Sequence, residues 1–374
     1  THTYRLSESF GGKFDITSQI NSRHEIKAGF QYRNDQLNER NFSILYDSNT
    51  YRIPTIAPEN ESPSHSYYSE NATIMSSYLQ DKLEYQSFIM NIGLRYDEFD
   101  PRTNHINNLI NPEIGEVASS KKTMWSPRIG VAFPITDQGI LHFSYGHFFQ
   151  MPTMRNLFLT SIFGAGLAPS IGYGDLKPQK TVMYEFGLQQ QLSHFIAING
   201  SLFFKDIRDL LALQSISYVS PTYGPSSYAV YLNKDYSMVQ GITLSLTKRR
   251  DPKTRLSAFL DYSYQTTEGN SVTSGSFYFN ALTGVEEEKK IVPLSWDQSH
   301  VFNATVSITE PGSNGWGLSF IGKMSTGWPY TPNIPFAGYI PFPNTSRKPV
   351  QQTLDMRLYK FISLAGFNFE LFFK

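Results

Sequence analysis

The sequence predicts an all-β protein that forms the wall of an antiparallel transmembrane β-barrel. Three features predict it: alternating apolar and polar side chains, alternating short and long connections, and many aromatic but few charged residues. Aromatic residues make up 15% and charged residues 17% of the 374 residues, whereas about 25% are charged in a typical soluble domain. No apolar run approaches the roughly 18 residues that a membrane-spanning helix needs.

The segment 88–96 shows the alternation most clearly. Its even positions are apolar, whereas Asn91 and Arg95 occupy odd positions. Since successive side chains of a strand point to opposite faces, one face suits lipid and the other is polar. A soluble antiparallel sandwich alternates in the same way. The predicted strands that contain such segments are ten or more residues long. They exceed the roughly five or six residues of globular strands and are near the roughly 9–11 that cross a bilayer. Further segments with this pattern are 196–205, 242–247, 302–308 and 354–359.

The connections between the predicted strands alternate between short turns and long loops. Outer-membrane barrels have short periplasmic turns and long extracellular loops. We therefore place the long loops outside, at 35–72, 99–122, 148–179, 208–236, 268–296 and 327–350, and expect a small hairpin within 208–236. The fourteen predicted strands are 10–20, 23–34, 73–84, 86–98, 123–134, 138–147, 180–192, 194–207, 237–249, 254–267, 297–308, 316–326, 351–361 and 365–374.

The two terminal strands bear on how the sheet is completed. Thr1 does not begin a recognisable mature N-terminus, and Lys374 interrupts an alternating apolar run, so we expect a fragment of a longer protein. Unpaired backbone groups are costly in lipid. The strands therefore either close as a 14-strand barrel or form part of a larger one, in which 10–20 and 365–374 do not pair.

The sequence contains no recognisable catalytic or metal motif, so we predict neither an enzyme nor a cofactor. It has no cysteine and no G-x-S-x-G nucleophile elbow. His142 and His147 lie five residues apart on an extended segment, which places them on opposite faces and argues against a shared metal. Basic and acidic residues both number 32, and this zero net charge argues against a nucleic-acid partner.

Polar side chains on the predicted strands are expected to face the barrel lumen. A charged side chain on the lipid face near the midplane costs about 2–4 kcal/mol. The simplest role for the polar residues is lumen electrostatics and hydrogen bonding to whatever fills the barrel. They are Arg95, Asn199, Asp355, Arg357 and Glu370.

Aromatic residues in the long loops lie outside the membrane zone. Such rings can stack on a sugar or an aromatic ligand, or they can pack the loops against one another. Both interpretations stay open for the candidate ligand-binding residues Tyr173, Tyr223, Trp328, Tyr330 and Tyr339.

Several stretches resemble TonB-dependent outer-membrane receptors, especially the Bacteroidetes type that carries a carboxypeptidase-regulatory-like domain before the plug. The most specific stretch is D-L-K-P-x-K-T followed by Y-E-x-G, from Asp175 to Gly187. In that family it leads from an extracellular loop into a barrel strand, as predicted here for 180–192. The stretches 78–101 and 126–152 are also similar, and the resemblance covers nearly the whole chain.

The resemblance implies a 22-strand barrel with a plug in its lumen. Residues 1–374 would then be a partial barrel domain, strands eight to twenty-one, without the plug domain and the C-terminal strand. The implied function is ligand-gated active import of a scarce nutrient across the cell outer membrane. The TonB–ExbB–ExbD complex would energise it through the missing N-terminal region.

Implied partners are outer-membrane lipid and lipopolysaccharide, a small-molecule, glycan or peptide ligand, and, as an optional partner, a surface lipoprotein. The alternative functions are a passive 14-strand outer-membrane channel, a barrel enzyme and a surface adhesin. A plug domain in the preceding sequence would favour the importer. The loop composition does not identify the ligand.

Overall fold

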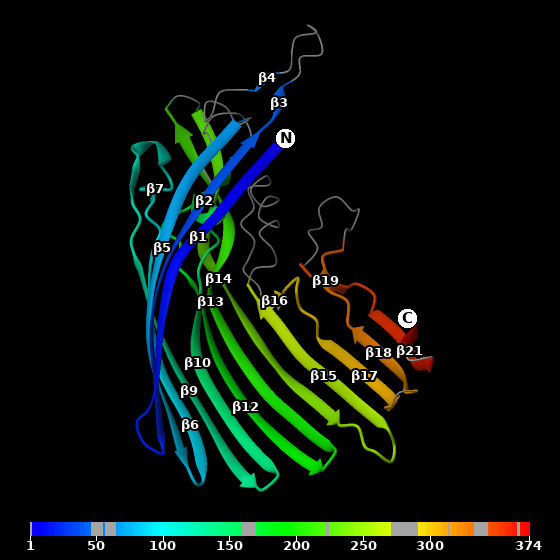
Figure 1. Ribbon diagram of the computed structural model, residues 1–374. Coiled ribbons are helices and arrows are strands. Elements are labelled where there is room, and N and C mark those ends of the chain that lie inside the picture. Colours follow the sequence, from blue (N-terminus) through cyan, green and yellow to red (C-terminus); the bar gives the residue numbers. More distant parts are fainter. Residues whose placement is uncertain are drawn as a thin grey trace.

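The computed structural model describes residues 2–45, 55–56, 65–158, 170–221, 224–270, 291–312, 314–332, 343–364 and 367–374. In this part of the chain, long antiparallel strands form one curved sheet (Figure 1). The helical elements described are α1 (Met154–Phe158) and one 3-10 turn (Pro112–Ile114). No helix in the described ranges is long and apolar enough to cross a membrane.

Fourteen long strands follow one another in the sheet in chain order. Every predicted strand is confirmed, and each neighbouring pair is antiparallel. The strands are β1 (His2–Gln19), β2 (His24–Phe42), β5 (His65–Tyr85), β6 (Phe88–Asp100), β9 (Lys122–Thr136), β10 (Gly139–Gln150), β12 (Gln179–Ser193), β13 (Ile196–Ser220), β14 (Gly224–Lys248), β15 (Leu256–Gly269), β17 (His300–Glu310), β18 (Trp316–Ser325), β21 (Gln351–Leu364) and β22 (Phe367–Phe373).

The strand ends that are joined by long connections lie at one end of the sheet, and the short turns lie at the other, as predicted (Figure 1). Small strands within the long connections add local pairs. β11 (Ser170–Ile171) pairs in parallel with β14, and β16 (Val292–Pro293) pairs with β15. Three further small pairs are β3 (Ile44–Leu45) with β4 (Thr55–Ile56), β7 (Asn104–Ile106) with β8 (Glu116–Ala118), and β19 (Pro329–Tyr330) with β20 (Ser346–Arg347).

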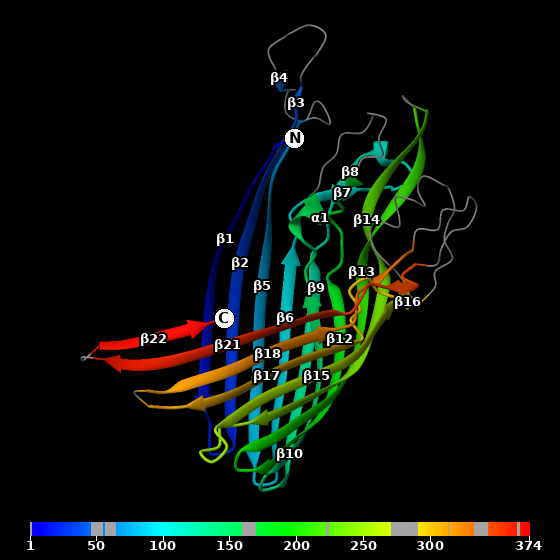
Figure 2. The same ribbon diagram turned by 90° about the vertical axis from the view of Figure 1, so that its right-hand side faces the viewer.

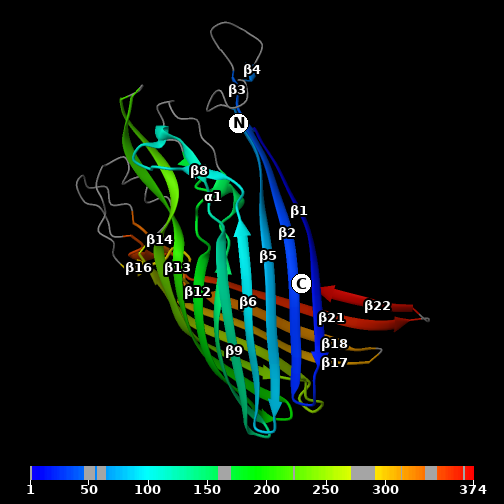
Figure 3. The ribbon, with the colours of Figure 1, turned by 90° about the vertical axis from the view of Figure 1, so that its left-hand side faces the viewer.

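The sheet is an open wall with β1 and β22 at its two edges. The sheet curls so that β17, β18 and β21 lie opposite the N-terminal strands, as the views from two opposite sides show (Figures 2 and 3). Among the described residues, the ladder partner of β1 is β2 and that of β22 is β21. The prediction that these two segments do not pair is therefore confirmed.

The hairpin expected within 208–236 exists, but it is a continuation of β13 and β14. Leu213 pairs with Tyr231 and Ser220 with Gly224. The register shifts between Ile207 and Leu210, where Asp209 adopts a positive φ of 59°. The alternating pattern fades there because strands beyond the bilayer need no apolar face, although their backbone ladder continues.

The two faces of the sheet differ in chemistry. Residues paired across an antiparallel ladder share a face, so the register carries each assignment from strand to strand. The polar face carries Arg95, Asn199, Asp355, Arg357 and Glu370. The apolar face carries exposed side chains that include Leu94, Ile198, Leu202, Leu244 and Phe302.

Candidate functional site

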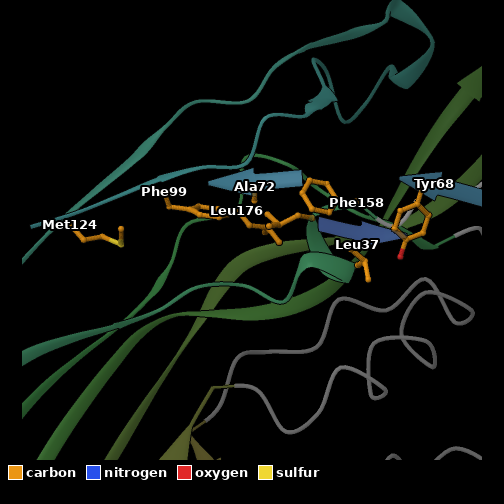
Figure 4. Packing of buried hydrophobic residues seen from close by; sticks show 8 residues of the cluster. Leu37, Tyr68, Ala72, Phe99, Met124, Phe158 and Leu176 are labelled. Atoms are coloured by element: carbon orange, nitrogen blue, oxygen red, sulfur yellow. The ribbon is translucent and has the colours of Figure 1, made fainter. Parts of the chain in front are cut away.

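The connection between β10 and β12 packs onto the polar face near the loop end of the sheet (Figure 4). It contributes Leu157 and Phe158 from α1, together with Leu176. Burying an aliphatic or aromatic side chain stabilises by about 1.5–3 kcal/mol, so this cluster holds the connection against the wall. The wall contributes Leu37, Tyr68, Ala72, Phe99 and Met124, from β2, β5, β6 and β9.

A buried carboxylate strengthens this attachment. Glu39 of β2 has a fully buried side chain and accepts hydrogen bonds from Arg5 Nε at 2.6 Å and Asn41 Nδ2 at 3.0 Å. Arg155 of α1 lies 3.8 Å from it. Burial alone would raise the pKa of Glu39, but these partners outweigh burial and lower it. The charged carboxylate therefore links α1 to the wall.

The motif that begins at Asp175 ties the end of the same connection to two strands. Asp175 accepts hydrogen bonds from the Ser120 backbone N–H at 2.9 Å and the Ser120 hydroxyl at 2.7 Å, and forms an ion pair with Lys122. Two residues later, the Lys177 N–H donates to Asn233 Oδ1 at 2.8 Å, and Asn233 Nδ2 donates back to the Lys177 carbonyl at 2.9 Å. These bonds give the motif a structural role.

Replacing Asp175 with Asn is expected to destabilise the protein at neutral pH but not near pH 2. Burial would raise the pKa of Asp175, but the bonds from Lys122 and Ser120 lower it to about 2. A carboxyl group whose pKa is lower in the folded than in the unfolded protein stabilises the fold when the pH is above its unfolded pKa of about 3.9. This stabilisation disappears as the pH falls through the folded pKa. Urea unfolding of the variant and of the unsubstituted protein in lipid vesicles, between pH 2 and 7, measures the difference in their free energies of unfolding. A difference that does not vary with pH would contradict the ion-pair assignment.

A cavity of about 300 Å³ lies on the polar face, with Phe149 and Met151 in its lining. Three arginines, one each from β2, β6 and β9, line it together with Asp97 and the hydroxyls of two buried serines. Arg95 donates to both oxygens of Asp97 at 2.9 Å, and Ser76 donates to Asp97 at 2.5 Å. The complete lining is Gln31, Arg33, Ile74, Ser76, Arg95, Asp97, Ser126, Arg128, Phe149 and Met151.

The five polar residues singled out from the sequence share one face but do not form one site. Arg357 and Glu370 meet at 3.4 Å across the last two long strands. Arg95 belongs to the cavity, whereas Asn199 and Asp355 lie on β13 and β21. Arg33 and Arg128 were not among the predicted residues, although each lies on the polar face of its strand, at an odd position in β2 and an even position in β9.

The aromatic candidates have different surroundings. Tyr173 is partly buried between two hydrophobic clusters and lies edge-on to His105, with ring centroids 4.9 Å apart. Trp328 and Tyr330 are exposed, and the Lys348 ammonium lies 5.8 Å from the Trp328 ring centroid. Packing therefore explains Tyr173 directly, while ligand contact stays a prediction for all of these rings. Tyr223 and Tyr339 lie outside the described residues.

The ladder places His142 and His147 on opposite faces. His142 Nε2 lies 3.8 Å from Glu185 of the neighbouring strand, whereas His147 accepts or donates a hydrogen bond with Tyr145 at 2.7 Å. The contact with Glu185 was not visible in the sequence because it joins different strands. Over the described ranges, no group of three or more His, Cys, Asp or Glu residues is arranged to hold a metal ion.

A comparison with protein families explains this architecture. The family described as TonB dependent receptor-like, beta-barrel, matches residues 1–370. The chain belongs to this family. It therefore forms part of a multi-pass β-barrel of the cell outer membrane.

Individual proteins that this chain resembles share few of its residues. A TonB-dependent heme receptor A of Haemophilus ducreyi is 22% identical over 226 residues, which cover 53% of this chain and 28% of the relative. The outer membrane transporter YddB from Escherichia coli has a TM-score of 0.66 at 13% identity, over 96% of this chain and 48% of its own. The FrpB iron transporter from Neisseria meningitidis has a TM-score of 0.61 at 15% identity. The match covers 98% of this chain and 50% of the transporter. The chain thus spans about half the length of these solved structures, and at such identities they show the fold alone.

Proposed function

We propose that this TonB-dependent receptor barrel forms the wall of an active importer that takes up a scarce nutrient. The family match over residues 1–370 carries the proposal. Relatives named as heme, iron and copper receptors or transporters support the general class of activity. Energy would come from the TonB–ExbB–ExbD complex, which would engage a part of the receptor outside the wall described here.

In this proposal the polar face lines the lumen and the apolar face contacts lipid. The charged groups of Arg95, Asp355 and Arg357 would each be destabilising in hydrocarbon, while exposed Leu202 and Leu244 are favourable there. The β10–β12 connection would then narrow the extracellular mouth, because it packs onto the polar face. An incoming ligand would pass it.

The test compares uptake in three otherwise identical strains: one with the intact receptor, one without it, and one with the receptor but without TonB. Radiolabelled haemin, ferric chelates, cobalamin, oligosaccharides and peptides serve as probes. The proposal expects uptake of one probe that requires both receptor and TonB. Uptake that persists without TonB would indicate a passive channel, and adhesion without receptor-dependent uptake would indicate an adhesin. Either result would overturn the proposal.

A further inference from the structure

The cavity on the polar face has an uneven charge balance. Arg33 and Arg95 each have a carboxylate two residues later on the same face: Arg33 Nε lies 2.9 Å from Asp35, and Arg95 Nη2 lies 2.8 Å from Asp97. Among the described residues, no carboxylate pairs with Arg128. Three guanidinium groups minus two carboxylates leave one positive charge at the cavity.

The sheet leaves room around Arg128 on both sides. Its ladder partners are Gly93 on β6 and Gly146 on β10. Neither neighbour has a side chain that would cover the guanidinium, and a Cβ at Gly146 would lie 3.4 Å from Arg128 Cγ. The guanidinium instead lies over the Phe148 ring, 4.7 Å from its centroid. This cation–π contact holds the group in place and leaves its N–H donors available.

The floor of the cavity supplies further polar groups at fixed positions. Ser76 and Ser126 are 3% and 2% exposed, and Asp97 is 8% exposed. The hydrogen bonds to Asp97 fix the Arg95 guanidinium, while Gln31 adds an amide. Donors held in place bind an anion more strongly than mobile surface groups, because less entropy is lost on binding. Arg128 itself is exposed, so an entering anion can reach its guanidinium.

We propose that this cavity is a binding subsite for a small oxyanion, a carboxylate or phosphate group of the imported ligand, with Arg128 as its principal contact. The planar guanidinium fork matches both groups with two parallel hydrogen bonds. The inference deepens the proposed function, on which it rests, by giving the ligand a chemical class. The subsite adjoins the β10–β12 connection, since Ile74, Phe149 and Met151 belong to its lining and also pack against the cluster there.

The test is calorimetric titration of the purified intact receptor with two probes, tricarballylate and pyrophosphate. Arg128→Ala is expected to weaken binding at least about tenfold, since charge-assisted hydrogen bonds are lost. Arg128→Lys, which keeps the charge but loses the fork, should weaken it less. Lys323→Ala removes a cation from the same face on distant β18 and should leave binding within about twofold.

Binding in detergent requires no TonB, so this result is independent of the uptake test. Circular dichroism and heat-dependent gel mobility confirm that each variant is folded. Equal affinities of the Arg128→Ala variant and the unsubstituted receptor would overturn the proposal, as would absence of binding by both probes at millimolar concentration. If neither probe binds but Arg128→Ala lowers the melting temperature, Arg128 stabilises the receptor itself and does not bind a ligand, which also overturns the proposal.

Discussion

Replacing Leu244 with Arg is expected to lower the free energy of unfolding in a bilayer by about 2–4 kcal/mol. Leu244 is 48% exposed on the apolar face of β14, between Gly200 and Tyr262 in the ladder. An arginine there must place its guanidinium in hydrocarbon or bend toward the headgroups. Urea unfolding of the intact receptor reconstituted in lipid vesicles measures the difference.

The neighbouring Ser245→Arg variant is the matched control, since it places the same side chain on the polar face. Ser245 donates a hydrogen bond to Asp261 at 2.7 Å. The variant loses this bond, but its guanidinium can pair with the same carboxylate, so we expect a loss of less than about 1 kcal/mol. Equal losses for the two variants would show that the faces are assigned wrongly.

Replacing Asp297 with Ala is expected to destabilise the loop end of β15 and the β19–β20 pair by about 2–3 kcal/mol. Asp297 is 2% exposed and accepts from the Thr267 N–H at 2.8 Å and the Ser299 hydroxyl at 3.0 Å. Arg347 Nη2 lies 2.5 Å from it. Alanine would leave the buried Thr267 N–H without its acceptor. Partly exposed Arg347 can be hydrated, which limits the loss.

Hydrogen exchange of peptides from 265–269 and 343–347 measures this effect, because local opening should accelerate exchange there first. Asp137→Ala, in the short turn at the opposite end of the sheet, serves as the control and should change stability by less than about 0.5 kcal/mol. Unchanged exchange at both peptides in the Asp297→Ala variant would show that this carboxylate does not hold the loops.

The bilayer explains why the strands were predictable from the sequence. Every long strand was anticipated, because lipid requires one apolar face and a complete backbone ladder. The outer ends of the strands were not anticipated. β2 continues to Phe42 and β13 to Ser220, beyond the predicted ends at 34 and 207. Outside lipid, a strand can be polar on both faces, and the alternating pattern then disappears.

The candidate site was harder to predict because it depends on contacts between distant segments. Helix α1 is too short to show a helical period. The burial of Glu39 depends on Arg5, 34 residues away, and on Arg155. The D-L-K-P motif was recognised as a family resemblance, but its bonds to Ser120 and Asn233 appear only in the folded structure.

The central claim is that adjacent residues of one strand face lipid and water in turn. The described chain has no cysteine, so single cysteines at Thr305 and Val306 of β17 can carry an environment-sensitive fluorophore. Brominated lipid quenches a fluorophore that contacts acyl chains. We expect strong quenching at position 306 and weak quenching at position 305 in the reconstituted receptor. Strong quenching at 305 with weak quenching at 306 would contradict the account.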